Sequence, residues 1–226
     1  WQVIPKVIHQ IWLGDPRKCP LDLINTWKEK NPTWKHTLWT DKNIPKLRNQ
    51  EQFDAMKELA GKADILRYEI LYNLGGFYID ADSKCIKPLD DSLLDAEVFC
   101  CYESEKYRPN LVANGYLATS KGSTLMEFAI RCIGTLSTTF FLELKELTAW
   151  MYTGPLFFSE LLKGKHQGKE FPAEGMETVT IHPSHYFIPR HYNDPRDFVY
   201  KGEGPVYCDQ YFMSTPNSIY DYHNNS

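Results

Sequence analysis

The chain has 226 residues, of which 42% are hydrophobic and 24% are charged, and its formal net charge is −4. These values predict one globular domain over residues 1–226 with one sizeable core. No stripe of Lys or Arg is present, which argues against a nucleic-acid partner, and no run approaches the ~18 apolar residues of a membrane span. The six cysteines form no C-x-x-C pair, which argues against a zinc knuckle. We expect buried thiols in a reducing compartment, with one or two disulfides in a secretory lumen as the alternative.

The first third of the chain has an α/β pattern. Residues 3–13 are β-branched and apolar and end at Gly-Asp-Pro, which predicts a buried strand and a turn. Helical spacing of apolar residues predicts a helix over 21–30, and alternation predicts a strand over 34–40. The order strand, helix, strand is typical of the opening of a parallel sheet.

The rest of the chain also alternates between predicted helices and strands, and Gly75-Gly76 is the predicted end of a strong helix. The expected elements are one or two short helices in 43–59, a helix over 61–74, strands over 77–80 and 83–89, strands over 97–102 and 112–119, a helix over 123–136, a helix over 156–163, a polar loop over 164–177, and a strand within 179–188. The last forty residues are rich in Pro, Tyr, His and Asp, and we expect irregular structure wrapped over a site.

An acidic motif follows the predicted strand at 77–80. Asp80 and Asp82 stand at i and i+2, so on an extended strand they share one face, with Cα atoms roughly 6.5 Å apart. One divalent cation could lie between them, bound directly by one carboxylate and through water by the other. Such hard oxygen ligands suit Mg²⁺ or Mn²⁺, which bind the phosphates of a substrate. Taken alone, the motif is explained more simply as a solvated turn.

A second charged pair stands one predicted helix earlier. Asp64 and Arg67 are at i and i+3, so they lie side by side on the helix. They could form a surface ion pair worth at most ~1 kcal/mol. Alternatively, Asp64 accepts hydrogen bonds from sugar hydroxyls, and Arg67 orients it or contacts the donor. The short Gly75-Gly76 connection keeps the helix close to the acidic strand, which favours a shared site.

Together these segments resemble a known family. The strings A-D-I-L-R-Y at 63–68 and L-G-G-F-Y-I-D-A-D at 74–82 are similar to the signature of the DXD glycosyltransferases of glycosyltransferase family 32. That family includes yeast Golgi mannosyltransferases, α-galactosyltransferases and bacterial capsule enzymes, and the glucosyltransferase domains of large clostridial toxins share the signature. I-P-K-V-I-H-Q-I-W-L-G from residue 4 and N-P-T-W-K-H-T-L-W-T-D from residue 31 also match. The resemblance is specific because several motifs occur in the family's order over positions 4–90.

The resemblance implies a GT-A fold, an α/β fold with a single Rossmann-like domain and a mostly parallel central sheet flanked by helices. The nucleotide would bind at the carboxyl ends of the strands. Asp82 resembles the direct metal ligand, and Asp80 resembles the residue that reaches the ribose or sugar and holds the metal through water. Asp64 and Arg67 match the pair that contacts the donor sugar. Tyr78 matches a tyrosine beside the nucleotide.

Further residues are implied by the resemblance alone. Ile11 and Trp12 stand where the family holds the base, and Trp12 could stack on it or belong to the core. Asn114, in an Asn-Gly pair, could line the acceptor side or form a turn. Thr153-Gly154-Pro155 is similar to a motif at the mouth of the site.

The end of the chain offers two more candidates. Family members often close the domain with a His followed by Gly/Asn-Ser-Trp, so His223 resembles the remaining metal ligand and Ser226 a phosphate contact. His182 and His185 are the other candidates for that ligand, although both also suit a structural strand end.

These features, together with the resemblance, predict metal-dependent transfer of a hexose from a UDP- or GDP-sugar to a glycan, lipid or protein acceptor, with Mn²⁺ or Mg²⁺ as cofactor. The resemblance implies that the transfer retains the anomeric configuration. Asp64, Arg67, Asp80 and Asp82 form the expected catalytic set. The cation and His223 would neutralise charge that develops on the leaving diphosphate. No carboxylate stands out as a nucleophile, so a front-face mechanism is preferred.

Two other function classes were weighed. In a glycosidase, paired carboxylates face each other across the scissile bond, usually from different elements, which does not suit two neighbours on one strand. A catalytically weak nucleotide-sugar-binding module is the remaining alternative. We expect a cytoplasmic location, with a Golgi-lumenal catalytic domain whose anchor was trimmed as the alternative.

Overall fold

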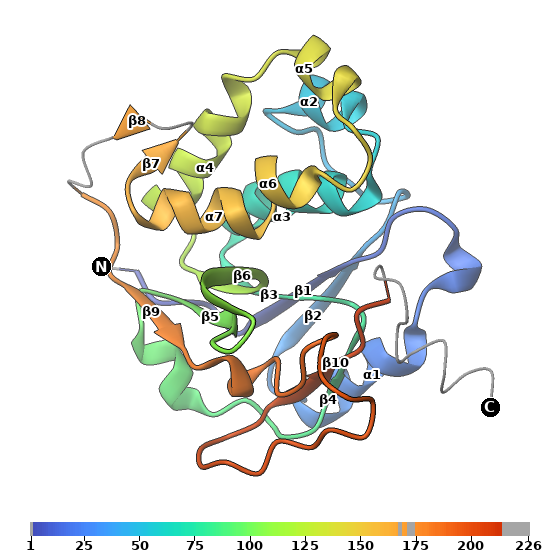
Figure 1. Cartoon of the computed structure of the whole chain (residues 1–226), viewed down its shortest axis with the longest axis vertical. Coiled ribbons are helices and arrows are strands. Elements are labelled where there is room, and N and C mark those ends of the chain that lie inside the picture. The colour runs from blue at the N-terminus through green and yellow to red at the C-terminus, as the bar shows by residue number, and fades with distance from the viewer. Residues whose placement is uncertain (1, 167–168, 171–174, 214–226) are drawn as a thin grey trace.

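The computed structural model describes residues 2–166, 169–170 and 175–213 (Figure 1). The helices, with η for 3-10 helices, are η1 (Pro16–Lys18), α1 (Leu21–Lys30), α2 (Gln50–Ala55), α3 (Leu59–Leu74), η2 (Asp91–Asp95), α4 (Thr124–Gly134), α5 (Thr138–Glu143), α6 (Ala149–Tyr152), α7 (Pro155–Leu162) and η3 (Ser184–Tyr186). The strands are β1 (Val7–Ile11), β2 (Lys35–Trp39), β3 (Gly76–Ile79), β4 (Ser83–Cys85), β5 (Val98–Ser104), β6 (Arg108–Thr119), β7 (Lys165–His166), β8 (Lys169–Glu170), β9 (Val179–His182) and β10 (Cys208–Gln210). None of the helices within those ranges is both long and apolar enough to cross a membrane.

A six-stranded sheet in the order β2-β1-β3-β6-β5-β9 forms the centre of the molecule. β1 is parallel to β2 and β3, and β5 is parallel to β9. β6 is antiparallel to both of its neighbours, β3 and β5. Five of the six strands therefore run in one direction, which confirms the predicted mostly parallel α/β sheet.

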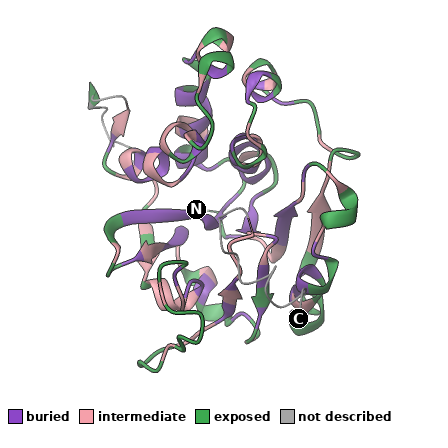
Figure 2. Cartoon of the chain, turned by 45° about the vertical axis from the view of Figure 1, so that its right-hand side comes forward, coloured by how far each residue is buried: buried purple, intermediate pink, exposed green. Residues whose placement is uncertain are grey.

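The sheet is covered on both faces (Figures 1 and 2). Helices α3, α4 and α7 cover one face, and α1 with the small β4–β10 ribbon covers the other. Each face has its own hydrophobic cluster, and β3 contributes to both because its side chains alternate: Tyr78 packs toward α3, whereas Phe77 and Ile79 pack toward α1. Trp27 of α1 is fully buried in the second cluster.

Two glycines join α3 to β3. Gly75 has φ +66° and Gly76 has φ +123°, and both values favour glycine. A Cβ atom on Gly75 would lie 2.5 Å from the backbone nitrogen of Lys121, and one on Gly76 would lie 2.6 Å from the carbonyl oxygen of Val7. The predicted glycine end of the helix is therefore confirmed, and the tight turn places α3 directly beside β3.

The main differences from the predicted elements concern short segments. The short helices α5 and α6 and strand β10 were not predicted, because segments of three to six residues carry too little periodicity. β10 exists because it pairs with β4, far away in the sequence. The strand predicted over 83–89 ends early, at Cys85, ahead of Pro88. The strand predicted within 179–188 is confirmed as β9, which ends at His182, before Pro183.

Candidate active site

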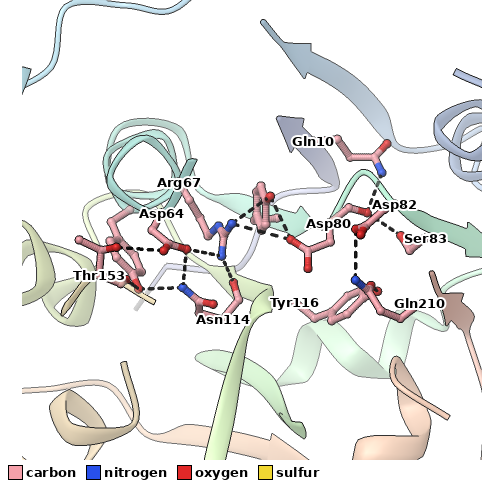
Figure 3. A network of polar contacts seen from close by, with 12 residues as sticks. Gln10, Asp64, Arg67, Asp80, Asp82, Ser83, Asn114, Tyr116, Thr153 and Gln210 are labelled. Carbon is pink, nitrogen blue, oxygen red and sulfur yellow. Dashed lines mark hydrogen bonds and ion pairs between the residues drawn. The ribbon is translucent and has the colours of Figure 1, made fainter. Parts of the chain in front are cut away.

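Asp64 and Arg67 of α3 are buried in the interior of the protein rather than exposed. Their exposed fractions are only 6% and 5%. Asp64 Oδ1 accepts a hydrogen bond from Asn114 Nδ2 at 2.9 Å and lies 3.2 Å from Arg67 Nη1, and Oδ2 accepts one from Thr153 Oγ1 at 3.0 Å (Figure 3). The interpretation of Asp64 and Arg67 as an ion pair on the protein surface is therefore wrong. A buried charge pair with additional hydrogen bonds holds one fixed geometry.

Arg67 links this pair to the acidic motif. Its Nη1 donates to the carbonyl oxygen of Asn114 at 2.7 Å, and its Nη2 donates to Tyr78 Oη at 3.1 Å. The Tyr78 hydroxyl donates in turn to Asp80 Oδ1 at 3.2 Å, and Arg67 Nη2 lies 3.7 Å from the same oxygen. The guanidinium carbon also lies 4.0 Å from the centre of the Tyr78 ring. Tyr78 therefore orients both charged groups.

Asp80 and Asp82 lie in a turn between β3 and β4, so the prediction that both belong to one strand is wrong. The chain leaves the sheet after Ile79. The Asp80 carbonyl oxygen accepts hydrogen bonds from Ser83 Oγ at 2.6 Å and from the buried Gln10 Nε2 at 3.4 Å (Figure 3). These contacts fix the turn at the carboxyl ends of β1 and β3, the edge at which open α/β sheets bind ligands.

Asp82 is held by the last residue of β10 and by the segment that follows it. Its Oδ1 accepts a hydrogen bond from Gln210 Nε2 at 3.1 Å, and its Oδ2 accepts one from the Met213 backbone nitrogen at 2.8 Å. The Gln210 side chain is itself oriented by the buried Tyr116 hydroxyl, which donates to its Oε1. Gln210 and Tyr116 were not predicted from the sequence. For Gln210 the one signal was the expectation that the last forty residues wrap over a site, and Gln210 and Met213 do contact Asp82.

An irregular stretch of β6 contacts Asp64 and Asp80 directly and reaches Asp82 through Gln210. Between Ala113 and Ala118, five steps along β6 oppose only two along β5. Bulges of this kind redirect side chains. Asn114 consequently faces α3 and Asp64, whereas Tyr116 lies in the cluster on the opposite face of the sheet. The alternative that Asn114 forms a simple turn is wrong, because it lies inside the strand.

Gly115 lies between these two residues, directly under Asp80. Its carbonyl oxygen accepts a hydrogen bond from the Asp80 backbone nitrogen at 2.9 Å. A Cβ atom at this position would lie 2.3 Å from Asp80 Oδ2. Only glycine leaves room for the carboxylate where it is.

The three carboxyl groups have raised pKa values. Burial raises the pKa of Asp80 to about 7, opposed by Arg67 and reinforced by the Asp82 charge. Burial also raises the pKa of Asp82 and of Asp64, although hydrogen bonds from the protein oppose the rise at both. Two carboxylates that repel each other in a half-buried turn are stabilised in their ionised form by a cation.

Asp80 and Asp82 suit a divalent cation. Among the described residues no donor contacts Asp80 Oδ2, and 28% of the Asp80 side chain is exposed, so this oxygen is available. In the described part of the chain no three His, Cys, Asp or Glu side chains are grouped to hold one ion, so His182 and His185 do not complete a site with the pair. Two carboxylates with substrate phosphates completing the coordination are typical of Mg²⁺ and Mn²⁺ sites.

Comparison with known proteins identifies this arrangement. Residues 20–100 match the family described as a glycosyltransferase sugar-binding region containing a DXD motif. The chain therefore carries the sugar-binding region of the DXD glycosyltransferases. The Asp80–Asp82 turn lies within the matched region and supplies the motif from which the family takes its name.

Two fungal relatives extend the match. The chain is 30% identical to inositol phosphoceramide mannosyltransferase 1 of Schizosaccharomyces pombe, over 69% of this chain and 50% of that protein. It is 28% identical to mannosyl phosphorylinositol ceramide synthase SUR1 of Saccharomyces cerevisiae, over 82% of this chain and 48% of that protein. The chain therefore spans about half the length of the curated relatives it matches.

Solved structures agree on the fold. The catalytic domain of alpha-toxin from Clostridium novyi superimposes with a TM-score of 0.55 at 11% identity, over 70% of this chain and 72% of that one. PaToxG glycosyltransferase superimposes with a TM-score of 0.51 at 18% identity, over 71% and 69% of the two chains. The chain therefore has the predicted GT-A fold.

The remaining residues predicted to bind the donor or the cation lie in the core, at the end of β1, or outside the described part of the chain. Ile11 is 5% exposed and packs in the cluster beneath α3, which places its side chain in the core. Trp12, directly after β1, is half-buried, and its Nε1 donates to the Asp15 carbonyl oxygen at 2.9 Å. His223 and Ser226 lie outside the described residues.

Proposed function

We propose that this chain transfers a hexose from a nucleoside diphosphate sugar to an acceptor hydroxyl, with retention of anomeric configuration. The observation that carries the proposal is the continuous network from Asp64 through Arg67 and Tyr78 to Asp80, closed by Asp82 at the carboxyl edge of β1 and β3. Such a rigid, partly buried acidic edge suits a substrate that brings both phosphates and hydroxyls.

In this proposal Asp80 and Asp82 hold Mn²⁺ or Mg²⁺, Asp80 through water. The cation would supply positive charge beside the leaving diphosphate. Tyr78 and Arg67 hold Asp80 in place, and Gln210 and the Met213 backbone nitrogen do the same for Asp82. Preorganised groups of this kind cost no reorganisation during the reaction.

Asp64 and Arg67 contact the donor sugar in this proposal. Both Asp64 oxygens already accept hydrogen bonds from Asn114 and Thr153, so the sugar hydroxyls would use the remaining acceptor positions of the carboxylate. Asn114 then acts by fixing Asp64 rather than by lining the acceptor side. Trp12 remains the candidate for contact with the base, and His223 and Ser226 the candidates for the cation and a phosphate.

The names of the relatives favour mannose as the sugar and an inositol phosphoceramide lipid as the first acceptor to try. Because GDP-sugars are the mannosyl donors expected for the family, we infer a GDP-mannose donor. The fungal mannosyltransferases among the relatives also favour the Golgi-lumenal alternative over the cytoplasmic expectation.

The test is a panel of UDP- and GDP-sugars with Mn²⁺ and with a chelator, read as donor binding by calorimetry and as donor hydrolysis or transfer. Asp82→Ala should abolish metal-dependent turnover, whereas Asp95→Asn, at an exposed carboxylate of η2, should leave it unchanged. Nuclear magnetic resonance of the product reports the anomeric configuration. Donor binding without hydrolysis or transfer would instead support the binding module, and no binding of any donor would refute the proposal.

A further inference from the structure

Two cysteines face each other across the β4–β10 ribbon. Cys85 and Cys208 are direct partners in this antiparallel pair. The Ile86 backbone nitrogen donates to the Tyr207 carbonyl oxygen at 2.8 Å, and the Cys85 nitrogen donates to Thr26 Oγ1 instead of across the ribbon. Because hydrogen-bonded and non-hydrogen-bonded pairs alternate along such a ribbon, Cys85 and Cys208 form a non-hydrogen-bonded pair. Their Cα atoms are then about 4.5 Å apart, with the side chains close together.

This spacing suits a covalent bond between the sulfur atoms. Disulfides join Cα atoms about 4.4–6.8 Å apart, so the backbone can stay where it is. Both residues have an exposed fraction of 0%. In the structure both are free thiols: Cys208 Sγ contacts the Phe187 carbonyl oxygen at 3.1 Å, and Cys85 Sγ contacts that of Lys87 at 3.4 Å. Rotation of the two side chains is the change that bonding requires.

We propose that Cys85 and Cys208 form a disulfide when the chain folds in an oxidising compartment. The Cys85 thiolate attacks glutathione disulfide and releases one glutathione. The Cys208 thiolate then attacks the Cys85 sulfur of the mixed disulfide and releases the second glutathione. The two protein thiols lose two electrons and two protons, and one glutathione disulfide becomes two glutathione thiols. The proposal does not rest on the proposed catalytic function.

The bond would act on the acidic motif, because both cysteines are close to Asp82 in sequence. Cys85 is three residues beyond Asp82, and Cys208 is two residues before Gln210, which donates to the Asp82 carboxylate. The ribbon consists of two three-residue strands, which are marginal on their own. A disulfide would prevent it from opening and would keep Gln210 and the Met213 backbone nitrogen on Asp82.

Burial decides when the bond can form. Burial raises the pKa of Cys85 to about 11 and raises the pKa of Cys208 well above its usual value, so neither thiol is reactive once the ribbon has closed. Oxidation therefore belongs to folding, when β10 docks on β4. The competing partner is Cys101, which lies in the same hydrophobic cluster on β5.

The test is to refold the full chain from denaturant in a reduced and oxidised glutathione buffer, block remaining thiols by alkylation, and map the peptides by mass spectrometry. Cleavage before aspartate separates Cys85, in residues 82–89, from Cys101, and places Cys208 in residues 197–208. We expect these two peptides to be linked in most molecules. Alkylation of both cysteines, or a link from Cys208 to Cys101, would overturn the proposal.

A second measurement addresses the effect on the acidic motif. Hydrogen exchange at the amides of Tyr211 and Met213, which both donate to Asp82, should be at least tenfold slower in the oxidised protein than after reduction. Cys208→Ala and Cys85→Ala should remove this difference, and Cys132→Ala, a buried cysteine of α4, should retain it. Equal exchange rates in the oxidised and reduced protein would refute the clamping of Asp82.

Discussion

The position of Asp80 depends on the absence of a side chain at residue 115. In Gly115→Ala the new Cβ atom would lie 2.3 Å from Asp80 Oδ2 and 2.8 Å from its Cγ. Ordinary contact begins near 3.4 Å, so the carboxylate must move by about 1 Å. Since a 1 Å misplacement can cost about 10²-fold in rate, we expect kcat/KM for donor turnover to fall by about 10². The φ angle of Gly115 is not in the left-handed region, so the free energy of unfolding should fall by only about 1–2 kcal/mol.

The assay is metal-dependent donor hydrolysis or transfer, with the free energy of unfolding measured in denaturant. Gly202→Ala is the matched control, because its Cβ would meet a side chain at a similarly short distance, 2.4 Å from the Tyr200 hydroxyl, and its nearest neighbours include none of the three acidic residues. The decisive variant combines Gly115→Ala with Asp80→Ala, which removes the atoms that the new methyl group would displace. If the two losses of activity add up in the double variant, Gly115 does not act through Asp80 and the reasoning is refuted.

Three further predictions concern the same network. Without metal, the free energy of unfolding should fall by about 2 kcal/mol as the pH rises from about 4 to about 7. The reason is that the pKa of Asp80 is raised to about 7 in the folded protein. Folded Asp80 therefore keeps its proton over this pH range, whereas the unfolded chain has already released it. Thermal unfolding across this range checks it, and Asp80→Asn should flatten the trend. Gln210→Leu should weaken Mn²⁺ binding about 10- to 100-fold by calorimetry, since it removes a donor to Asp82; an unchanged affinity would exclude this role. Thr153→Val should cost about 1–3 kcal/mol of unfolding free energy by leaving Asp64 short of a donor, whereas Thr153→Ser should cost little; equal losses would contradict this reason.

Local patterns in the sequence predicted the long elements well. The helix ending at Gly75 and the strand that follows were predicted because glycine conformation and apolar periodicity act over a few residues. Segments such as β10 form only through pairing with a distant strand, so no local pattern marks them. The boundaries of β6 were also missed: its exposed first residues, from Arg108, carry no apolar pattern but pair with β5.

The candidate site, like the fold, was predicted where local sequence determines it and missed where distant segments meet. Asp64, Arg67, Asp80 and Asp82 were predicted as neighbours because the short glycine turn constrains how far α3 can lie from the end of β3. Gln210 contacts Asp82 across 128 residues of sequence, a relation that only the packed fold reveals. The supporting roles of Asn114 and Tyr116 depend on the bulge of β6. A bulge arises from a mismatch between two strands, which neither strand shows alone.

The bulge of β6 also bears on how such a protein can diverge. Three consecutive residues position three different acidic side chains: Asn114 bonds Asp64, Gly115 leaves room for Asp80, and Tyr116 orients the Gln210 side chain that bonds Asp82. These three residues therefore form one structural unit that cannot be changed one residue at a time. An insertion or deletion inside Ala113–Ala118 would move all three partners together. A second irregularity in the strand pairing, between Tyr102 and Ser104, lies nearer the tip of the β5–β6 hairpin. Insertions or deletions at the tip can be accommodated there without shifting Asn114, Gly115 and Tyr116. Length changes can therefore accumulate at the hairpin tip while the three acidic side chains keep their partners.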